Sequence, residues 1–533
     1  MNIKALLFIF SCTTLTVQAQ QEDFGQDALI NPSAATFNFD IASGPIEPTD
    51  ESIAAHYQCP EWFRNAKFGI YMHWGVNSVP GHDGHYGRWM YWYQEPDSCL
   101  RKHPILGYRV HAPKVYQHHL KTYGHPSKFG YKDFIPMWKA DKFNADSLAA
   151  FYKEIGAKFI GVMAVHHDNF DLYDSSHQPW NSVNMGPKLD IVGAWQKACK
   201  KVGVHFAISS HLSNYCHEHM FYQGTNADPE GPYAGIPYDY MDPAYEGLYG
   251  KRTPDRIMRL EPEFAQSWYL RTKELIDKYE PELLYFDGPL PNGIYGQQLA
   301  AHFYNKNPRA VMFGKMLNDE QREALTWDVE RGAPNEIVEE PWQTCNCLGN
   351  WHYNTSIYER GSYKSATEVI KQLIDIVSKN GNLLLSIPLR ADGTYDEKEA
   401  AILDGIEAWM TVNKESIFNT RPWVRFGEGP VAESDIKLKA QGFNDGMYSN
   451  MTSADIRFNQ TKKYLYVTPL GWPEDGKVVV RSLAKGNPHF KKNITTVELL
   501  GYGCLKVVQT DNGLEIQLPI VTNAIAPVLK ISK

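Results

Sequence analysis

Cysteine and surplus positive charge are both scarce in this chain, and long apolar runs are missing beyond its N-terminus. The 533 residues include only 8 cysteines, and their irregular spacing does not indicate a disulfide framework. Lys and Arg total 53 against 61 Asp and Glu, a net charge of −8 that leaves no basic field for nucleic acid. After the N-terminus no apolar run approaches the roughly 18 residues that would span a membrane.

Aromatic side chains are abundant instead. They make up 13% of the chain, with 14 Trp and 31 Tyr, and hydrophobic residues make up 43%. A disordered chain would contain fewer aromatics, so the composition predicts a folded protein with several domains. Cys345-Asn346-Cys347 has no second Cys/His pair at zinc spacing, so we expect no metal and no other cofactor.

The first 19 residues are typical of a signal peptide. Lys4 supplies a positive start, an apolar stretch begins at Ala5, and Val17-Gln18-Ala19 is a small-residue cleavage site. We therefore expect export to the periplasm or the extracellular space. A buried first helix and a cell-surface lipoprotein acylated on Cys12 are weaker alternatives, the second because the bulky Phe10 stands where a small residue is expected.

The remaining chain divides into a linker or clamp at 20–55, a catalytic region at 56–425 and a third region at 426–533. In the catalytic region short β-rich runs alternate with helical stretches, which predicts an α/β fold of the (β/α)8-barrel type. The expected strands are Phe68–Trp74, Phe159–Val165, Val204–Ser209, Leu283–Phe286, Ala310–Phe313, Leu325–Val329, a short strand near Trp342, and Leu383–Ile387.

After about residue 425 only short strands follow, which predicts a C-terminal antiparallel β-sandwich. We see no clear aromatic platform there and expect a structural cap, although sugar binding by this domain stays open. The expected strands are Lys463–Val467, Lys477–Val480, Thr496–Leu500, Leu505–Gln509, Leu514–Leu518 and Val528–Ile531.

Unusual polar residues follow the expected barrel strands one after another. Reactive groups of a barrel lie at the C-terminal ends of its strands, so these residues predict one polar, aromatic-lined pocket. Such a pocket suits a sugar, and a pair of carboxylates within it is what glycoside hydrolysis requires. The residues are His73-Trp74, His166-His167-Asp168, His211, Asp287-Gly288, Lys315 and Glu330-Arg331.

Each of these features also has a plainer interpretation. His166 and His167 could bind zinc, but adjacent strand residues point to opposite faces. His211 could be a core histidine, and Glu330 could form a surface ion pair with Arg331. Their joint occurrence at successive strand ends favours the functional interpretation. Among the carboxylates at these strand ends, Asp287 is the preferred candidate for the nucleophile. It follows an apolar strand, and Gly288 beside it leaves room for a substrate to approach.

Several motifs resemble those of glycoside hydrolase family 29, the α-L-fucosidases. The similarity runs in order from about residue 52 to 425. The motifs are Lys67-Phe-Gly-Ile-Tyr-Met-His-Trp-Gly75, His166-His-Asp-Asn-Phe170, Gly186-Pro-Lys-Leu-Asp190, Tyr285-Phe-Asp-Gly288, Asn382-Leu-Leu-Leu-Ser-Ile387 and Asn413-Lys-Glu-Ser-Ile417.

The resemblance implies a retaining mechanism in which Asp287 is the nucleophile and a second carboxylic acid protonates the leaving oxygen. Tyr285 stands where the family often has Trp facing the sugar, and Lys315 where many members have Arg. With the resemblance, the expected substrate-binding residues are His73, Trp74, Trp89, His166, His167, His211, Tyr285, Lys315 and Trp342.

Two positions depart from the family pattern. Where many members carry Trp-Glu, with that Glu as the acid, this chain has Trp342-Gln343. We therefore expect Glu330 to be the acid/base, with Glu339 and Glu340 as alternatives. The family's Glu-Trp-Tyr segment is replaced by Arg88-Trp-Met90, which puts a positive charge near the pocket mouth. That charge would suit an anionic substrate such as a sulfated glycan, but a solvated Arg or a local ion pair is the stronger interpretation.

The expected function is exo-acting, retaining hydrolysis of terminal α-L-fucose from a fucosylated glycan, with or without sulfate groups. An α-L-galactosidase of the same family is one alternative, since L-fucose is 6-deoxy-L-galactose. A non-catalytic glycan-binding protein is another, motivated by Gln343 and Arg88. An intact Asp287 argues against that second alternative. The sequence does not give the linkage, the aglycone or the oligomeric state.

Overall fold

The computed structural model describes most of the expected barrel and of the C-terminal domain. The expected signal peptide at 1–19 lies outside the described residues. Within the part of the chain that is described, no helix is both long and apolar enough to cross a membrane. The described residues are 37–93, 112–212, 226–250, 262–288, 290, 293–315, 317–434, 440, 443–521 and 524–533.

Eight parallel strands close into a barrel, which confirms the expected fold class. Each strand pairs with the next along the chain, and the last pairs with the first. Because all eight run the same way, their C-terminal ends meet at one mouth. The strands are β1 (Phe68–Met72), β2 (Phe159–Val165), β3 (His205–Ser210), β4 (Leu283–Phe286), β5 (Val311–Gly314), β6 (Thr326–Glu330), β7 (Trp342–Cys347) and β8 (Gly381–Ser386).

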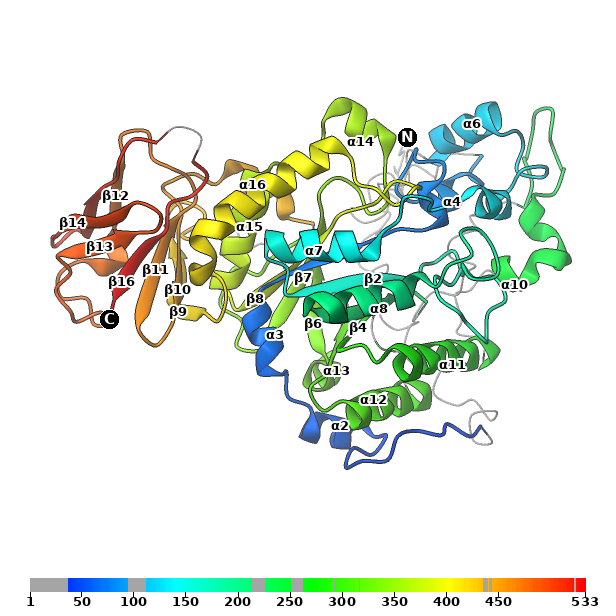
Figure 1. The fold of residues 1–533 in the computed structure, drawn as a ribbon, viewed down its shortest axis with the longest axis horizontal. Coiled ribbons are helices and arrows are strands. Elements are labelled where there is room, and N and C mark those ends of the chain that lie inside the picture. The colour runs from blue at the N-terminus through cyan, green and yellow to red at the C-terminus, as the bar shows by residue number, and fades with distance from the viewer. Residues whose placement is uncertain are drawn as a thin grey trace, which may run out of the picture.

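Amphipathic helices cover the outside of the barrel (Figure 1). In α8 (Ile191–Val202) the apolar face is buried, and Trp195 on that face stacks on Tyr152 of α7 (Ala145–Ile155). The Asp190 side chain accepts from the amide of Gly193 at its start, and Gly203, in the left-handed conformation, ends the helix. The other long helices are α6 (Ala112–Thr122), α11 (Pro262–Tyr279), α12 (Ile294–Lys306), α15 (Ala366–Ser378) and α16 (Glu397–Asn413).

The described part of the N-terminal segment runs along the barrel's outer helices. Phe39 packs edge-on against Tyr269 of α11, whose hydroxyl donates to the Phe39 carbonyl at 2.6 Å. The Asn305 side chain of α12 hydrogen-bonds the backbone of Ile46. A short helix, α2 (Asp50–His56), follows and leads the chain to β1 through α3 (Glu61–Ala66).

An antiparallel sheet of eight strands forms the C-terminal domain and lies beside the barrel (Figure 1). Its inward side chains, among them Trp423, Phe458 and Leu465, build a second hydrophobic core. The strand order is β12-β15-β14-β13-β16-β11-β10-β9. The strands are β9 (Arg421–Glu428), β10 (Ile456–Gln460), β11 (Tyr464–Pro469), β12 (Lys477–Val480), β13 (Thr496–Leu499), β14 (Gly503–Gln509), β15 (Leu514–Gln517) and β16 (Leu529–Ser532).

Two of these strands, β9 and β10, are missing from the sequence-based expectation. Strand β9 contains Pro422 and two arginines, and Pro is depleted in strands. Its place beside β10 at the edge of the sheet tolerates the missing amide. The pairing of β9 with β10 also means that the antiparallel sheet begins at Arg421, a few residues before the expected boundary at 426.

A buried ion network joins the two domains. Asp375 on α15 accepts from the Arg457 guanidinium of β10 at 2.5 Å and from the Lys379 ammonium at 2.8 Å. The Tyr448 hydroxyl adds a third donor at 3.1 Å. Burial by itself would raise the pKa of Asp375, but Lys379 and Arg457 outweigh it and lower that pKa. One carboxylate thus compensates two buried cations.

We expect Asp375→Asn to destabilise the protein by about 3–5 kcal/mol, because it leaves two cations buried without a counter-charge. Urea unfolding of the full chain, followed by tryptophan fluorescence, measures this loss. The matched control is Asp404→Asn on the exposed face of α16, which should change stability by about 0.5 kcal/mol or less. Equal effects of the two substitutions would contradict the importance of the network.

Candidate active site

Two carboxylates and one ammonium meet at the C-terminal mouth of the barrel. Asp287 directly follows β4, Lys315 follows β5, and Glu330 is the last residue of β6. The Lys315 Nζ lies 2.7 Å from Asp287 Oδ1 and 3.0 Å from Glu330 Oε2. These two oxygens are therefore no farther apart than the sum of those lengths, and one cation holds both acids.

Asp287 is ionised in this setting. Burial would raise its pKa, but the Lys315 ammonium and a hydrogen bond from His167 lower that pKa well below its usual range. The His167 Nε2 lies 3.2 Å from Asp287 Oδ2, so each carboxylate oxygen has a partner. The Asp287 carboxylate, together with Glu330, raises the pKa of Lys315 well above its usual value, although burial opposes this. The sequence prediction that these groups meet is correct.

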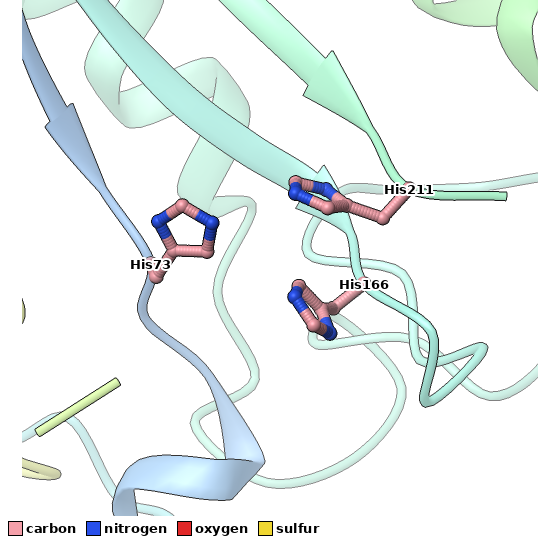
Figure 2. A group of neighbouring side chains, drawn as sticks. All are labelled: His73, His166 and His211. Carbon is pink, nitrogen blue, oxygen red and sulfur yellow. The ribbon is translucent and has the colours of Figure 1, made fainter. Parts of the chain in front are cut away.

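Three further imidazoles line the mouth beside Asp287 (Figure 2). His73 follows β1, His166 follows β2 and His211 follows β3, and the three rings face one another. All three side chains are buried. His73 Nδ1 lies 3.1 Å from the Ser386 hydroxyl, while Tyr71, whose hydroxyl lies 3.3 Å from His211 Nε2, supports His211 from below.

These imidazoles are neutral at physiological pH. Burial is the largest cause in each case: it lowers the pKa of His211 to about 3 and places those of His73 and His166 well below their usual value. A neutral imidazole offers one donor and one acceptor, which matches the two-way hydrogen bonding of a sugar hydroxyl. The nitrogens of His73, His166 and His211 also lie within 4.8 Å of one another, so they are the residues that could hold a cation here.

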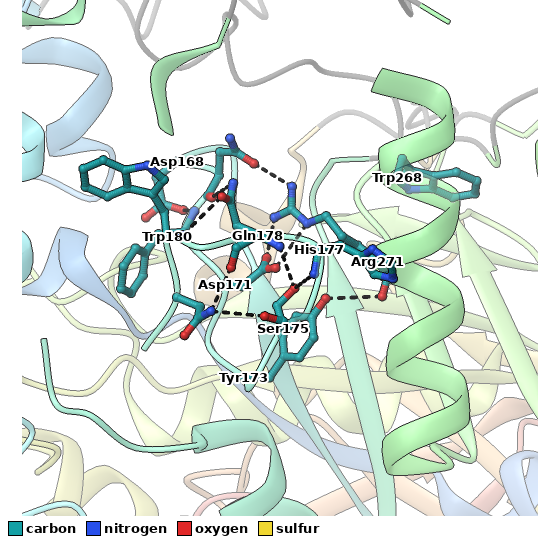
Figure 3. Close-up of polar contacts among 12 residues, drawn as sticks. Asp168, Asp171, Tyr173, Ser175, His177, Gln178, Trp180, Trp268 and Arg271 are labelled. Carbon is teal, nitrogen blue, oxygen red and sulfur yellow. Dashed lines mark hydrogen bonds and ion pairs between the residues drawn. The ribbon is translucent and has the colours of Figure 1, made fainter. Parts of the chain in front are cut away.

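The loop that carries His166 and His167 is anchored from behind by α11 (Figure 3). Arg271 donates through Nε to Asp171 at 3.1 Å and through Nη1 to Asn169 at 2.6 Å, and its other nitrogen also contacts Asp171. Asp168 accepts from the Tyr131 hydroxyl at 2.6 Å, and burial raises the pKa of Asp168 to about 6. The loop is thus held by buried polar bonds.

A second polar cluster lies inside the barrel beneath Lys315. Asp328 of β6 accepts from the Gln343 amide at 2.9 Å, from the Cys345 thiol at 3.1 Å and from the Tyr285 hydroxyl at 3.2 Å. Burial raises the pKa of Asp328 to about 7, although Lys315 opposes this. Because Asp328 and Glu330 are two residues apart on one strand, they share the barrel-facing side, with Asp328 one layer deeper.

The residue after Glu330 is fixed by the C-terminal domain. Arg331 Nε lies 3.2 Å from Asp445 Oδ2, and the Asp445 amide donates to the Arg331 carbonyl at 3.1 Å. Lys364 approaches the same Asp445 oxygen at 3.1 Å. Arg331 itself has a φ of 49°, a left-handed conformation that a non-glycine residue adopts only when its surroundings impose it. The acid candidate is therefore positioned by both domains.

Two family models match this chain. An α-L-fucosidase model covers residues 34–415, and an α-L-fucosidase C-terminal domain model covers residues 449–532. The chain belongs to the α-L-fucosidase family. This confirms the resemblance to glycoside hydrolase family 29 drawn from the motifs, and it confirms that the protein is a glycoside hydrolase.

Individual relatives agree with the family models. Human plasma α-L-fucosidase is 27% identical over 497 residues, which cover 90% of this chain and 89% of that protein. An α-L-fucosidase of Dictyostelium discoideum is 26% identical over 90% of both chains. The crystal structure of Thermotoga maritima α-fucosidase superposes with a TM-score of 0.67 at 25% identity, covering 91% of this chain and all of that one.

Four residues expected to touch the sugar make other contacts in this α-L-fucosidase family member. Tyr285 points into the barrel interior toward Asp328, below the mouth. Trp342 points outward, where its Nε1 donates to the Lys379 carbonyl. Trp74 packs edge-on against Trp138 and donates to the Arg390 carbonyl, and Trp89 is buried against Trp92. Strand alternation and loop packing explain these corrections.

The alternative acids are also misplaced. Glu339 and Glu340 are exposed and precede β7, at the end of the barrel opposite the mouth. Gln343, which occupies the family's Trp-Glu position by sequence, bonds to Asp328 inside the barrel. Among the described carboxylates that we considered as the acid, Glu330 alone lies beside Lys315 and Asp287.

Three site residues were missed because they lie on loops. Trp351 and His352 follow β7, which continues to Cys347, well past the short strand expected near Trp342. The Trp351 ring lies 4.9 Å from that of His73, and Lys315 Nζ lies 5.9 Å from the Trp351 ring. His85 and His352 flank His166, at 5.9 and 4.8 Å between ring centres. A correct end for β7 would have pointed to the Trp351-His352 pair.

We expect Lys315→Met to move the acid limb of kcat/KM upward by about one pH unit or more, because an opposite charge at this distance lowers a carboxyl pKa by about 1–3 units. Without the ammonium, burial raises the pKa of Asp287, which is then protonated over more of the acid range. The measurement is the pH profile on 4-nitrophenyl α-L-fucoside. Lys315→Arg keeps the charge and should keep the limb in place. An unshifted limb in Lys315→Met would contradict the assignment.

Proposed function

We propose that this chain is an exo-acting, retaining α-L-fucosidase that releases terminal α-L-fucose from glycans by double displacement. The observation that carries the proposal is the Lys315 bridge between Asp287 and Glu330, at 2.7 and 3.0 Å. Retaining enzymes hold their two carboxyl groups about 5–5.5 Å apart, whereas inverting enzymes need about 6.5–9.5 Å. Because Lys315 contacts both carboxylates, the bridge favours the shorter separation, which is that of a retaining enzyme.

In the first step Asp287, ionised and held by Lys315 and His167, attacks the anomeric carbon of the sugar. Glu330 donates its proton to the glycosidic oxygen, the bond to the aglycone breaks, and a glycosyl ester forms on Asp287. In the second step Glu330 takes a proton from water, which attacks the same carbon and frees Asp287. A covalent intermediate trapped with 2-fluoro-fucosyl fluoride is described for an α-L-fucosidase of Bacteroides thetaiotaomicron, whose fold this chain shares.

The sugar itself is bound by the neutral imidazoles. We propose that the sugar hydroxyls form hydrogen bonds with His73, His166 and His211, whose rings converge beside Asp287 (Figure 2). Trp351 supplies an aromatic face at the same mouth. A Thermotoga maritima relative of 26% identity has been crystallised with fucose, which supports fucose as the sugar. Residues 1–19, whose pattern is typical of a signal peptide, support our proposal of action outside the cytoplasm.

We expect Asp287→Asn to lower kcat on 4-nitrophenyl α-L-fucoside by on the order of 10³-fold or more, because no ester can form. Glu330→Ala should slow release from the ester by about 10²–10⁴-fold, and added azide should restore the rate by attacking without a base. Steady-state rates and analysis of the azide product measure both effects. The matched control is Glu339→Gln, an exposed carboxylate that should retain full activity.

For the sugar, we expect kcat/KM to be higher on 4-nitrophenyl α-L-fucoside than on the α-L-galactoside. A pocket that merely lacks a partner for an added hydroxyl rejects it by about a hundredfold. A higher value on the galactoside would instead make the protein an α-L-galactosidase. Both substrates are aryl glycosides, which need little acid assistance. If the protein cleaves neither of them, the hydrolytic proposal fails.

A further inference from the structure

A large groove opens at the end of the barrel opposite the active site. It encloses about 1490 Å³ where the barrel meets the C-terminal sheet. The residues before β1, β2 and β3 line one side of it, and the turn between β10 and β11 lines the other. The reactive carboxylates lie at the C-terminal ends of β4 and β6, at the opposite end of the barrel, so the groove is a separate site.

This groove is strongly basic in a protein of net charge −8. Seven Lys or Arg side chains line it, against two Glu. Both glutamates already have partners: Glu61 is paired with Arg421, and Glu415 with Lys530. Among the described residues, Lys414 and Lys462 form no ion pair, and both are exposed. The groove therefore carries a surplus of cations.

The surplus shows in the electrostatics of Lys158, one of the lysines that line the groove. Burial lowers the pKa of Lys158, and the neighbouring Lys414 and Lys153 lower it further. No described carboxylate offsets this repulsion at Lys158. An anion bound here would replace repulsion between like charges by attraction, which is the condition for electrostatic recognition.

Aromatic side chains also line the groove. Trp62 stacks on His205 with ring centres 3.9 Å apart, and Lys158 Nζ lies 4.5 Å from the Phe418 ring. Tyr464 and Tyr466 of β11 line the opposite side. Aromatic rings suit the apolar faces of sugars, and the ammonium groups suit sulfate or carboxylate substituents.

We propose that this groove binds an anionic polysaccharide, a chain of sugars bearing sulfate or carboxylate groups, apart from the active site. This occupant fits the charge surplus and the aromatic residues that line the groove. A chain held at this end keeps the enzyme on a polymeric glycan while the mouth of the barrel acts on exposed chain termini. The binding step does not require hydrolysis.

The probe is dextran sulfate, with neutral dextran as the uncharged counterpart. In affinity electrophoresis and calorimetry of the mature chain, we expect binding to dextran sulfate that weakens as NaCl rises, and none to dextran. The double variant Lys414→Glu/Lys462→Glu should lose about tenfold or more in affinity, since charge reversal repels the polyanion. The control Lys128→Glu/Lys477→Glu reverses two exposed lysines that do not line the groove.

Hydrolysis of 4-nitrophenyl α-L-fucoside is measured on every variant and should be unchanged, so that failure of this proposal is distinguishable from failure of the hydrolytic one. Absence of binding to dextran sulfate would overturn the groove proposal. An equal loss in the control double variant would do so as well, because it would indicate diffuse surface charge. Tighter binding of single-stranded poly(dT) than of dextran sulfate would assign the groove to nucleic acid instead.

Discussion

One ammonium group shared by two carboxylates organises this active site. Without Lys315, the burial that raises the pKa of Asp287 would no longer be opposed by the ammonium. With Lys315 present, the Asp287 carboxylate stays ionised. Glu330 lies 3.0 Å from the same ammonium and faces the same pocket. The chemistry of a nucleophile and an acid/base requires this asymmetry between two similar groups. Lys315 therefore supports the division of roles in the mechanism we propose.

The surrounding structure holds these three side chains still. Parallel strands deliver Asp287, Lys315 and Glu330 to the same mouth, and each follows or ends its strand. Arg271 fixes the loop of His166 and His167 by buried hydrogen bonds, and Asp328 fills the barrel beneath Lys315. Groups positioned by rigid elements lose little freedom when the sugar arrives, which is what makes a preorganised site effective.

Much of this arrangement could be predicted from the sequence because strand ends are a strong signal. An apolar run followed by His, Asp or Lys marks a barrel mouth, and that pattern located Asp287, Lys315, Glu330 and the histidines. The direction in which a side chain points from its strand was harder to predict. Trp342 was placed by residue type, whereas strand alternation turns it away from Gln343 and outward. Loop residues such as His85 and Trp351 come together only through tertiary packing, which no local pattern encodes.

The contact between Arg331 and Asp445 has an evolutionary consequence. Arg331, the residue next to the proposed acid/base Glu330, is held in a left-handed conformation by a carboxylate that belongs to the other domain. The barrel is therefore not an interchangeable module. A recombination event that exchanged the C-terminal domain for another would have to supply a carboxylate at the same place, and otherwise the backbone beside Glu330 would relax. Inheritance of the two domains as a pair is the expected outcome of that constraint.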